Sequence, residues 1–274
     1  MPAKPQPPLI YFYGVAPVWS AAPQALRIED GVIPRMPIEL RPAGAVTAIV
    51  SAFGEEPELT DQGAGGIEWD QSRVLAHHRV LDALSARMPL LPAKFGAVFR
   101  GLHHLLAYIN ENENRFRANL RQVEGCREWG VKFSGSLERA RDAVCGDPEF
   151  DAREREIQEA SAGKAFILRR KLTQAIEDAA QSALAKAISG MCDELAGLAR
   201  AHSQINSRDG RAAAEESVLL YESAYLVEHS RKQRFLEVLS RPQPALEGLG
   251  IFTRVTGPWP PYNFVSMSPR AENG

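Results

Sequence analysis

A proline-rich segment near the C-terminus constrains the fold more than any other feature of the chain. Gly257 to Val265 reads Gly-Pro-Trp-Pro-Pro-Tyr-Asn-Phe-Val. Because proline fixes φ and has no backbone N–H, this segment is predicted to be neither a helix nor a central strand. It is expected to be a stiff, extended ribbon that carries the rings of Trp259, Tyr262 and Phe264. Ordering a stiff ribbon costs little entropy, so these rings are expected to dock on the chain's own domain or on a partner.

Composition places the chain among ordinary globular proteins. Its 274 residues are 45% hydrophobic and 24% charged, which allows one large domain or two domains of ordinary size. The formal net charge is −2. A balance this close provides no basic surface for nucleic acid and no polybasic membrane patch. We therefore predict neither nucleic acid nor a membrane as a partner.

The cysteines and the first eight residues indicate the cellular compartment of the protein. Cys126, Cys145 and Cys192 are odd in number and far apart, which predicts a reducing cytoplasm and not a disulfide framework. The segment 1–8 is rich in proline and lacks the apolar core of a signal peptide, so it is predicted to be a disordered lead.

The periodicity of apolar residues predicts an α+β fold with two domains. In the first half we expect strands at 9–15 and 45–53 and helices at 69–88 and 101–122. In the second half we expect strands at 128–134, 217–227 and 249–256, helix from Asp147 to about Ala201, and a helix at 230–239. The second half then resembles a split βαβ, or ferredoxin-like, arrangement with one long helix. We predict a lead at 1–8, an N-terminal α+β domain at 9–122, a modified ferredoxin-like domain at 123–256 and a tail at 257–274.

The groups that most resemble catalytic or metal sites are two histidine pairs. The members of His77-His78, and of His103-His104, point about 100° apart on a helix and cannot hold one ion together. The cysteines lack CxxC spacing, and residues 63–66 (Gly-Ala-Gly-Gly) lack the lysine and hydroxyl of a phosphate loop. We therefore predict no catalytic residue, no metal site and no cofactor.

One feature of the long helix leaves two interpretations open. A stripe of small residues can pack on the helix's own sheet, or it can form a surface for a partner helix. The stripe consists of Ala175, Ala179, Ala180, Ala183 and Ala187.

Several segments, in order along nearly the whole chain, resemble the GvpF/GvpL family of gas vesicle proteins. They are Tyr13-Gly14-Val15, the segment 90–96 (Leu-Leu-Pro-Ala-Lys-Phe-Gly), 128–132 (Glu-Trp-Gly-Val-Lys) and 256–264, with weaker matches at 163–167 and 224–227. The terminal segment is the most specific of them. The sequence does not separate the F and L members.

The resemblance implies a non-enzymatic accessory or minor structural protein that acts in gas vesicle assembly. It implies contacts with the small hydrophobic shell protein and with other accessory proteins, and a place in the cytoplasm and on the gas vesicle, at the gas-facing side of its wall. It also implies two α+β domains, the second a modified ferredoxin-like one. The residues carried over as family-motif or interaction candidates are Phe95, Gly96, Trp129, Gly130, Gly257, Pro258, Trp259, Pro260, Pro261, Tyr262 and Phe264.

A second hypothesis is a small-molecule-binding or enzymatic α+β protein that shares only the architecture. It predicts a deep pocket lined by groups with shifted pKa values, with the histidine pairs and Glu128 as the first places to look. For the tail, we expect that Trp259, Tyr262 and Phe264 mostly pack against their own protein. Truncating Trp259 to alanine is then expected to cost a few kcal/mol.

Overall fold

The computed structural model describes residues 7–18, 31–33, 35–54, 71–205 and 218–265. Most of the proline-rich lead, the glycine segment 63–66 and the end of the tail lie outside these ranges. The chain forms two compact units, one made of residues 1–128 with 258–274 and the other of residues 129–257. The division of domains at 122/123 and 256/257 stays a prediction from the sequence.

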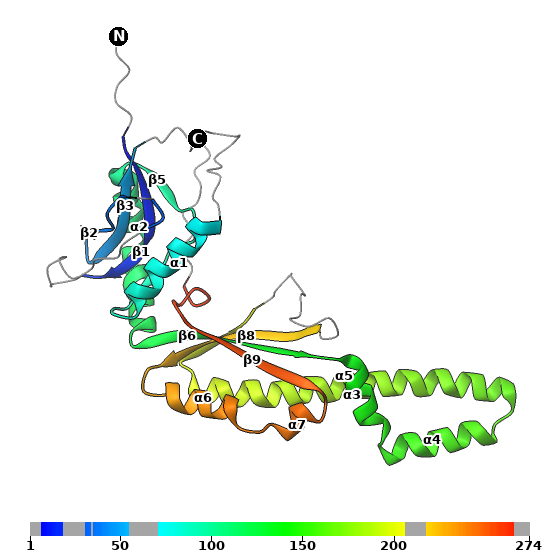
Figure 1. The fold of residues 1–274 in the computed structure, drawn as a ribbon. Coiled ribbons are helices and arrows are strands. Elements are labelled where there is room, and N and C mark those ends of the chain that lie inside the picture. The colour runs from blue at the N-terminus through cyan, green and yellow to red at the C-terminus, as the bar shows by residue number, and fades with distance from the viewer. Residues whose placement is uncertain (1–6, 19–30, 34, 55–70, 206–217, 266–274) are drawn as a thin grey trace, which may run out of the picture. The chain divides into compact units, whose positions relative to one another are not determined.

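The first unit is built on a sheet in which β2, β3, β1 and β4 follow one another, with β5 also paired to β1. Two helices flank this sheet (Figure 1). The elements are β1 (Leu9–Pro17), β2 (Glu39–Ala43), β3 (Val46–Phe53), α1 (Gln71–Ser85), β4 (Leu91–Pro92), β5 (Val98–Arg100) and α2 (Leu102–Val123).

Strand β1 is buried on both of its faces, which accounts for its continuous apolar and aromatic sequence. Tyr11 and Tyr13 belong to a core that includes Val80 and Leu84 of α1. Phe12 points to the other face, where its ring lies 6.5 Å from that of Tyr108 on α2. The central strand therefore connects two apolar layers, one under each helix.

The sequence analysis missed β2. This strand pairs on one side only, with β3, and contains Pro42. An edge strand tolerates proline because the N–H that proline lacks would face away from the sheet, so no hydrogen bond between strands is lost. Pro42, which lies between the first two strands that the sequence predicted, is therefore itself part of a strand.

The second unit is a ferredoxin-like fold whose strands follow the order β7-β8-β6-β9. The helix order agrees with a βαββαβ arrangement, with α5 after the first strand and α6 after the third. The elements are β6 (Cys126–Gly135), α3 (Leu137–Cys145), α4 (Pro148–Glu159), α5 (Ala162–Leu198), β7 (Ala201–Gln204), β8 (Val218–Glu228), α6 (Lys232–Ser240), α7 (Pro244–Glu247) and β9 (Ile251–Trp259). The predicted fold class, α+β with one long helix, is confirmed.

The helical region after Asp147 is divided, whereas the sequence predicted helix from there to about Ala201. Asp147 caps α4 as expected, since its side chain accepts a hydrogen bond from the Glu149 N–H at 3.0 Å. The chain then turns at Ala160 and Ser161, both extended, and α5 begins. No glycine or proline marks this turn. It is stabilised by packing between α4 and the first half of α5, through Phe150 and Ile157 on one helix and Ala165 and Leu172 on the other.

Helix α5 has 37 residues and is about 55 Å long. Its second half covers the sheet and contributes Leu184, Ile188, Met191 and Leu195 to the core of the unit. Its first half extends past the sheet and lies beside α4 (Figure 1). Of the small-residue stripe, Ala180 is fully buried in the core, which favours packing on the helix's own sheet at that position. Among the described residues, no helix combines the length and apolar character needed to cross a membrane.

Candidate functional site

The tail that the sequence singled out returns to the first unit. Strand β9 continues to Trp259, which corrects the expectation that the last strand ends at Thr256. The strand lies at the edge of its sheet, so Pro258 fits there without removing a hydrogen bond from the ladder. The chain passes from the second unit to the first between Gly257 and Pro258, and a turn follows at 261–264.

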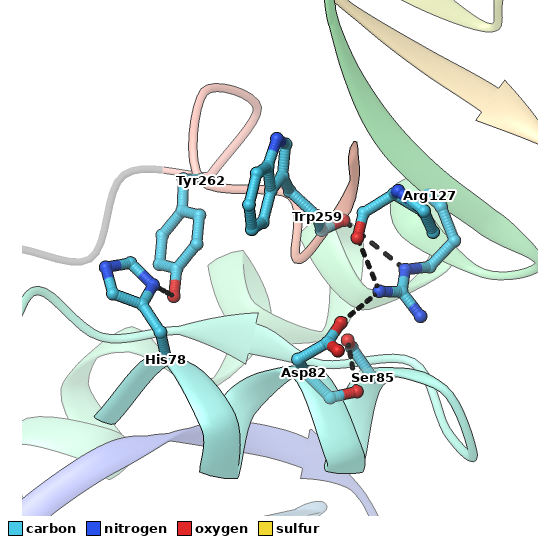
Figure 2. Close-up of polar contacts among 7 residues, drawn as sticks. His78, Asp82, Ser85, Arg127, Trp259 and Tyr262 are labelled. Atoms are coloured by element: carbon cyan, nitrogen blue, oxygen red, sulfur yellow. Dashed lines mark hydrogen bonds and ion pairs between the residues drawn. The ribbon is translucent and has the colours of Figure 1, made fainter. Parts of the chain in front are cut away.

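Arg127 holds the backbone of this segment in place. Its Nη2 donates to the carbonyl of Pro258 at 3.0 Å and to Oδ1 of Asp82 on α1 at 2.5 Å, and its Nε donates to the carbonyl of Trp259 at 3.4 Å. Figure 2 shows the guanidinium between α1 and the tail. Proline removes backbone donors but keeps its carbonyl acceptor, so a cationic side chain with several donors suits such a segment. The side chain of Arg127 is itself mostly buried.

Glu128 fixes the turn that follows. Its two carboxylate oxygens accept hydrogen bonds from the backbone N–H and the side-chain amide of Asn263, at 2.8 and 2.6 Å. Only 3% of Glu128 is exposed, and this burial raises the pKa of its carboxyl, against the opposing effect of the two hydrogen bonds. Arg127 and Glu128 are adjacent, so one dipeptide contacts the tail at both ends of its turn.

The aromatic residues of the tail differ in their burial. Tyr262 packs against the core of the first unit, and its hydroxyl pairs with Nδ1 of His78 on α1 at 2.9 Å (Figure 2). Burial, together with the charges of Glu128 and Asp82, raises the pKa of that hydroxyl. Pro260, Pro261 and Phe264 are buried or half-buried. Trp259, in contrast, is 42% exposed, so it packs against the protein less completely than Tyr262 and Phe264 do.

Phe95 and Gly96 lie beside the same core. The ring of Phe95 meets that of His77 edge-on, with 5.6 Å between centroids. The backbone N–H of Gly96 donates to the hydroxyl of Tyr11 at 3.3 Å, and its φ of 81° is one that glycine adopts without strain. The segment 90–96 therefore forms a turn over the aromatic face of β1, which is a structural role.

The two members of the His77-His78 pair have different structural roles. His77 is 1% exposed, and its Nδ1 pairs with the hydroxyl of Tyr11 at 2.9 Å. Burial lowers the pKa of His77 to about 4, so the imidazole is neutral at pH 7. His78 contacts the tail through Tyr262, and in the other pair the rings of His103 and His104 lie 4.0 Å apart between centroids, tilted by 39°. Within the described part of the chain, no three histidine, cysteine, aspartate or glutamate side chains form a group that could hold a metal ion.

Trp129 and Gly130 lie in the second unit. Trp129 is 6% exposed, joins the core, and has the ammonium of Lys232 5.9 Å above its ring. A Cβ at Gly130 would lie 2.7 Å from Oγ1 of Thr256 on the neighbouring strand β9, so a side chain there would push against that strand. These two candidates serve packing within the ferredoxin-like sheet, apart from the residues that contact the tail.

An apolar groove on the second unit lies away from every residue that the sequence analysis proposed. It has a volume of about 630 Å³ and lies between the second half of α5 and strands β7 and β8. Leu184, Ile188, Leu220 and Tyr221 provide apolar lining, and Cys192 lies in its wall. Burial raises the pKa of the Cys192 thiol, which keeps the thiol protonated and a poor nucleophile.

The polar residues that contact the tail were largely missed from sequence. Arg127 and Asp82 belong to no motif, and Asn263 was part of the terminal segment without being singled out; the hydrogen-bonded partners are between 45 and 135 positions apart. Glu128 was named in the resemblance segment 128–132 and in a hypothetical pocket, but not as a partner of the tail. The available signal was that Glu128 begins this segment, with Arg127 directly before it.

Comparison with known proteins gives these observations a family. A family model described as "Gas vesicle synthesis protein GvpL/GvpF" matches residues 9–266. Gas vesicle protein F of Streptomyces sp. (strain CB03234) is 27% identical over 259 residues, covering 93% of this chain and 98% of that protein. Gas vesicle protein L of the same strain is also 27% identical, over 229 residues, covering 82% of this chain and 80% of that protein. Equal identity to both leaves the F and L types unseparated.

Solved structures agree in fold. The crystal structure of the gas vesicle protein GvpF from Anabaena sp. PCC7120 superposes with a TM-score of 0.69 and 19% sequence identity, covering 95% of this chain and 99% of that one. That of GvpF from Microcystis aeruginosa gives a TM-score of 0.63 at 17% identity, covering 94% and 99%. The resemblance stated from the sequence is thus confirmed over both units and the tail, and this chain belongs to the GvpL/GvpF family of gas vesicle synthesis proteins.

Proposed function

We propose that this protein acts in gas vesicle assembly by binding the small hydrophobic shell protein and other accessory proteins, without catalysis, cofactor or metal. The observation that carries the proposal is the family match, which spans residues 9–266 and so includes both units and the tail. We further propose that it works in the cytoplasm and on the gas vesicle, at the gas-facing side of its wall.

The burial of the residues in the resemblance segments is compatible with this role. Trp129 is buried in the core of the second unit, Phe95 and Tyr262 are half-buried against the core of the first, and Trp259 presents about two fifths of its surface to solvent. Burial of apolar area and complementary shape, which drive protein association, need no reactive group. Of the tail candidates, Trp259 is therefore the one best placed to touch a partner.

A deletion experiment tests the proposal. In a strain that carries the gene and no paralogue of it, deletion is expected to stop or weaken vesicle formation, seen by electron microscopy and by loss of pressure-sensitive light scattering. A plasmid copy of the gene should restore both. Normal vesicles in the clean deletion would refute the proposed role.

A binding experiment tests the partner. The purified chain is expected to retain the small shell protein in a pull-down or a split-reporter assay, and the Trp259→Ala variant to retain less of it. A Phe252→Ala variant is the matched control, because Phe252 is also an exposed aromatic residue on β9. Equal retention by both variants would place the contact elsewhere on the chain.

The groove in the second unit favours a second candidate, the binding of a small apolar ligand. Its volume and mostly apolar lining are typical of small-molecule sites. The test is to fill it with an Ala185→Trp substitution, since Ala185 lines the groove and its side chain is exposed. Full complementation of the deletion strain by this variant, with unchanged stability, would leave the groove without a functional role.

A further inference from the structure

The α4–α5 hairpin has a small apolar core of its own, separate from the core under the sheet. Phe150 and Ile157 of α4 meet Ala165 and Leu172 of α5, and these are the fully buried members of the cluster. The first half of α5 therefore has one face turned inward to α4, and the opposite face has no packing partner from the hairpin core.

Two large apolar side chains lie on that opposite face. Phe166 is 71% exposed and Ile167 is 57% exposed. At 100° per residue, Phe166 lies about 100° and Ile167 about 160° around the helix from the buried Ala165. Arg170 lies between these two positions on the same face. Gly163 lies on the same face, one turn earlier, with no atom within 4 Å of where its Cβ would be. We call Gly163, Phe166, Ile167 and Arg170 the outer face of α5.

Cationic side chains without ion-pair partners adjoin this face. Arg169, Arg170 and Lys171 are exposed, and among the described residues none of them forms an ion pair. The nearby Lys164, in contrast, pairs with Glu156 at 3.1 Å. From Ala162 to Ile176, α5 carries these four cations and no carboxylate. The outer face therefore combines exposed apolar area with unneutralised positive charge.

We propose that the outer face of α5 is a docking surface for a segment of a partner protein in which apolar side chains lie next to carboxylates. The argument is charge complementarity. The apolar pair supplies burial, and the three unpaired cations supply attraction and select an acidic neighbour. The proposal deepens the proposed function by stating the chemistry of a partner, and it rests on the idea that this chain works through protein contacts.

The hairpin itself argues against an anionic membrane as the occupant. Helix α4, which lies beside α5, exposes five carboxylates and only two arginines. A broad anionic surface would repel α4 as it attracted α5, whereas a narrow acidic segment can contact α5 alone. A second copy of the chain could offer the carboxylates of α4, but the exposed positions of α4 include no large apolar side chain to cover Phe166 and Ile167.

The test measures binding of synthetic peptides to the full-length protein by fluorescence anisotropy. The probe is a helical peptide with leucine on one face and glutamate on the other, and its matched relatives carry lysine or glutamine in place of glutamate. We expect the glutamate peptide to bind at least ten-fold more tightly than either relative, and its binding to weaken as salt rises. Equal binding of the glutamine peptide would overturn the charge argument.

Variants of the protein locate the binding. Phe166→Ser with Ile167→Ser, and separately Arg170→Glu, are each expected to weaken binding of the glutamate peptide at least ten-fold. The matched controls are Phe252→Ser, an exposed aromatic on β9, and Lys186→Glu, an exposed cation further along α5 that forms no ion pair with another described residue. All of these positions are exposed, and circular dichroism and the melting temperature check that each variant folds. Similar weakening by the controls would overturn the assignment to the outer face.

Two further measurements test the other possible occupants, a membrane and a second copy of the chain. Binding to phosphatidylglycerol vesicles that is stronger than binding to the glutamate peptide, and is lost in Arg170→Glu, would overturn the proposal in favour of a membrane. Dimerisation in light scattering that the double serine variant abolishes would do so in favour of a second copy. If the glutamate peptide does not bind but the deletion strain makes no vesicles, this surface alone is refuted. If the peptide binds but the deletion strain makes normal vesicles, the proposed function is refuted instead.

Discussion

The buried carboxylate of Glu128 receives both the backbone N–H and the side-chain amide of Asn263, a residue 135 positions later in the chain. A carboxylate held away from water needs such donors, because burial without them costs several kcal/mol. Together with Arg127, this pair attaches the proline-rich tail to the first unit.

Replacing Asn263 with alanine is expected to lower the free energy of unfolding by about 1–3 kcal/mol, because one oxygen of Glu128 would lose its donor in a buried place. Urea denaturation at pH 7 measures it. Asn112→Ala is the control, since among the described residues the Asn112 amide bonds only to the carbonyl of Tyr108 within α2, and its removal leaves no buried charge behind. A loss in Asn263→Ala no larger than in the control would contradict this account.

The raised pKa of Glu128 predicts how stability depends on pH. A carboxyl whose pKa is higher in the folded than in the unfolded state contributes stability below its unfolded pKa, and that contribution is lost as pH rises through the folded value. Compared with a Glu128→Gln variant, the wild-type protein should therefore become relatively less stable as pH rises from about 4 towards neutrality. Parallel urea titrations at several pH values measure the difference. A constant difference across this range would mean that the carboxyl is not perturbed.

His77 predicts a pH dependence of the opposite sign. Its pKa of about 4 lies below the usual value, so between these limits the unfolded chain binds a proton that the folded chain does not. Stability should fall as pH falls from about 6.5 to 4, by up to about 3 kcal/mol from this residue. In His77→Gln that slope should be shallower than in the wild type. Equal slopes in the two proteins would disprove the assignment.

Two tryptophans provide a matched comparison of core and tail. Trp129 is 6% exposed and Trp259 is 42% exposed. Trp129→Ala is expected to cost about 3–5 kcal/mol, as buried aromatic truncations do, and Trp259→Ala about 1 kcal/mol. This value for Trp259 replaces the few kcal/mol that the sequence suggested. Thermal denaturation of both variants measures the two losses of stability. A larger loss for Trp259→Ala than for Trp129→Ala would mean that the Trp259 ring is buried in solution.

Gly14 is expected to tolerate no side chain. A Cβ there would lie 2.3 Å from the carbonyl oxygen of Leu91 on the paired strand β4, and a backbone atom cannot move aside cheaply. Gly14→Ala should therefore destabilise the first unit by at least about 2 kcal/mol. Gly54→Ala is the control, because no atom of the residues that the structure describes lies within 4 Å of the corresponding position. Comparable melting temperatures for the two variants would count against the close approach of β1 and β4.

The sequence predicted the elements whose signal is local. The apolar run of β1, the capping of α4 by Asp147 and Pro148, and the periodicity of α5 each depend on residues within a few positions of one another, and each is present. Elements that depend on distant partners were missed. Strand β7 has only four residues and half-exposed side chains, so its pairing with β8 defines it, not its composition.

The same distinction applies to the candidate site. The tail was conspicuous because three prolines and three aromatic rings stand together in sequence. Arg127 and Asp82 were invisible because a lone arginine and a lone aspartate on a helix look like ordinary surface residues. What makes them part of the tail's attachment is the fold, which brings Arg127 to the carbonyl groups of Pro258 and Trp259 and brings Asp82 to Arg127.

The chain leaves the first unit after Glu128 and returns to it at Pro258, so the ferredoxin-like unit is an insertion within the other. This nesting sets an order for synthesis on the ribosome. All residues of the inserted unit emerge before Tyr262, which packs on the core of the first unit, and before Asn263, which donates hydrogen bonds to the buried Glu128 carboxylate. The inserted unit can complete its folding while the other still waits for its last segment, and a ribosome that stops early would release a chain whose N-terminal half is the incomplete one.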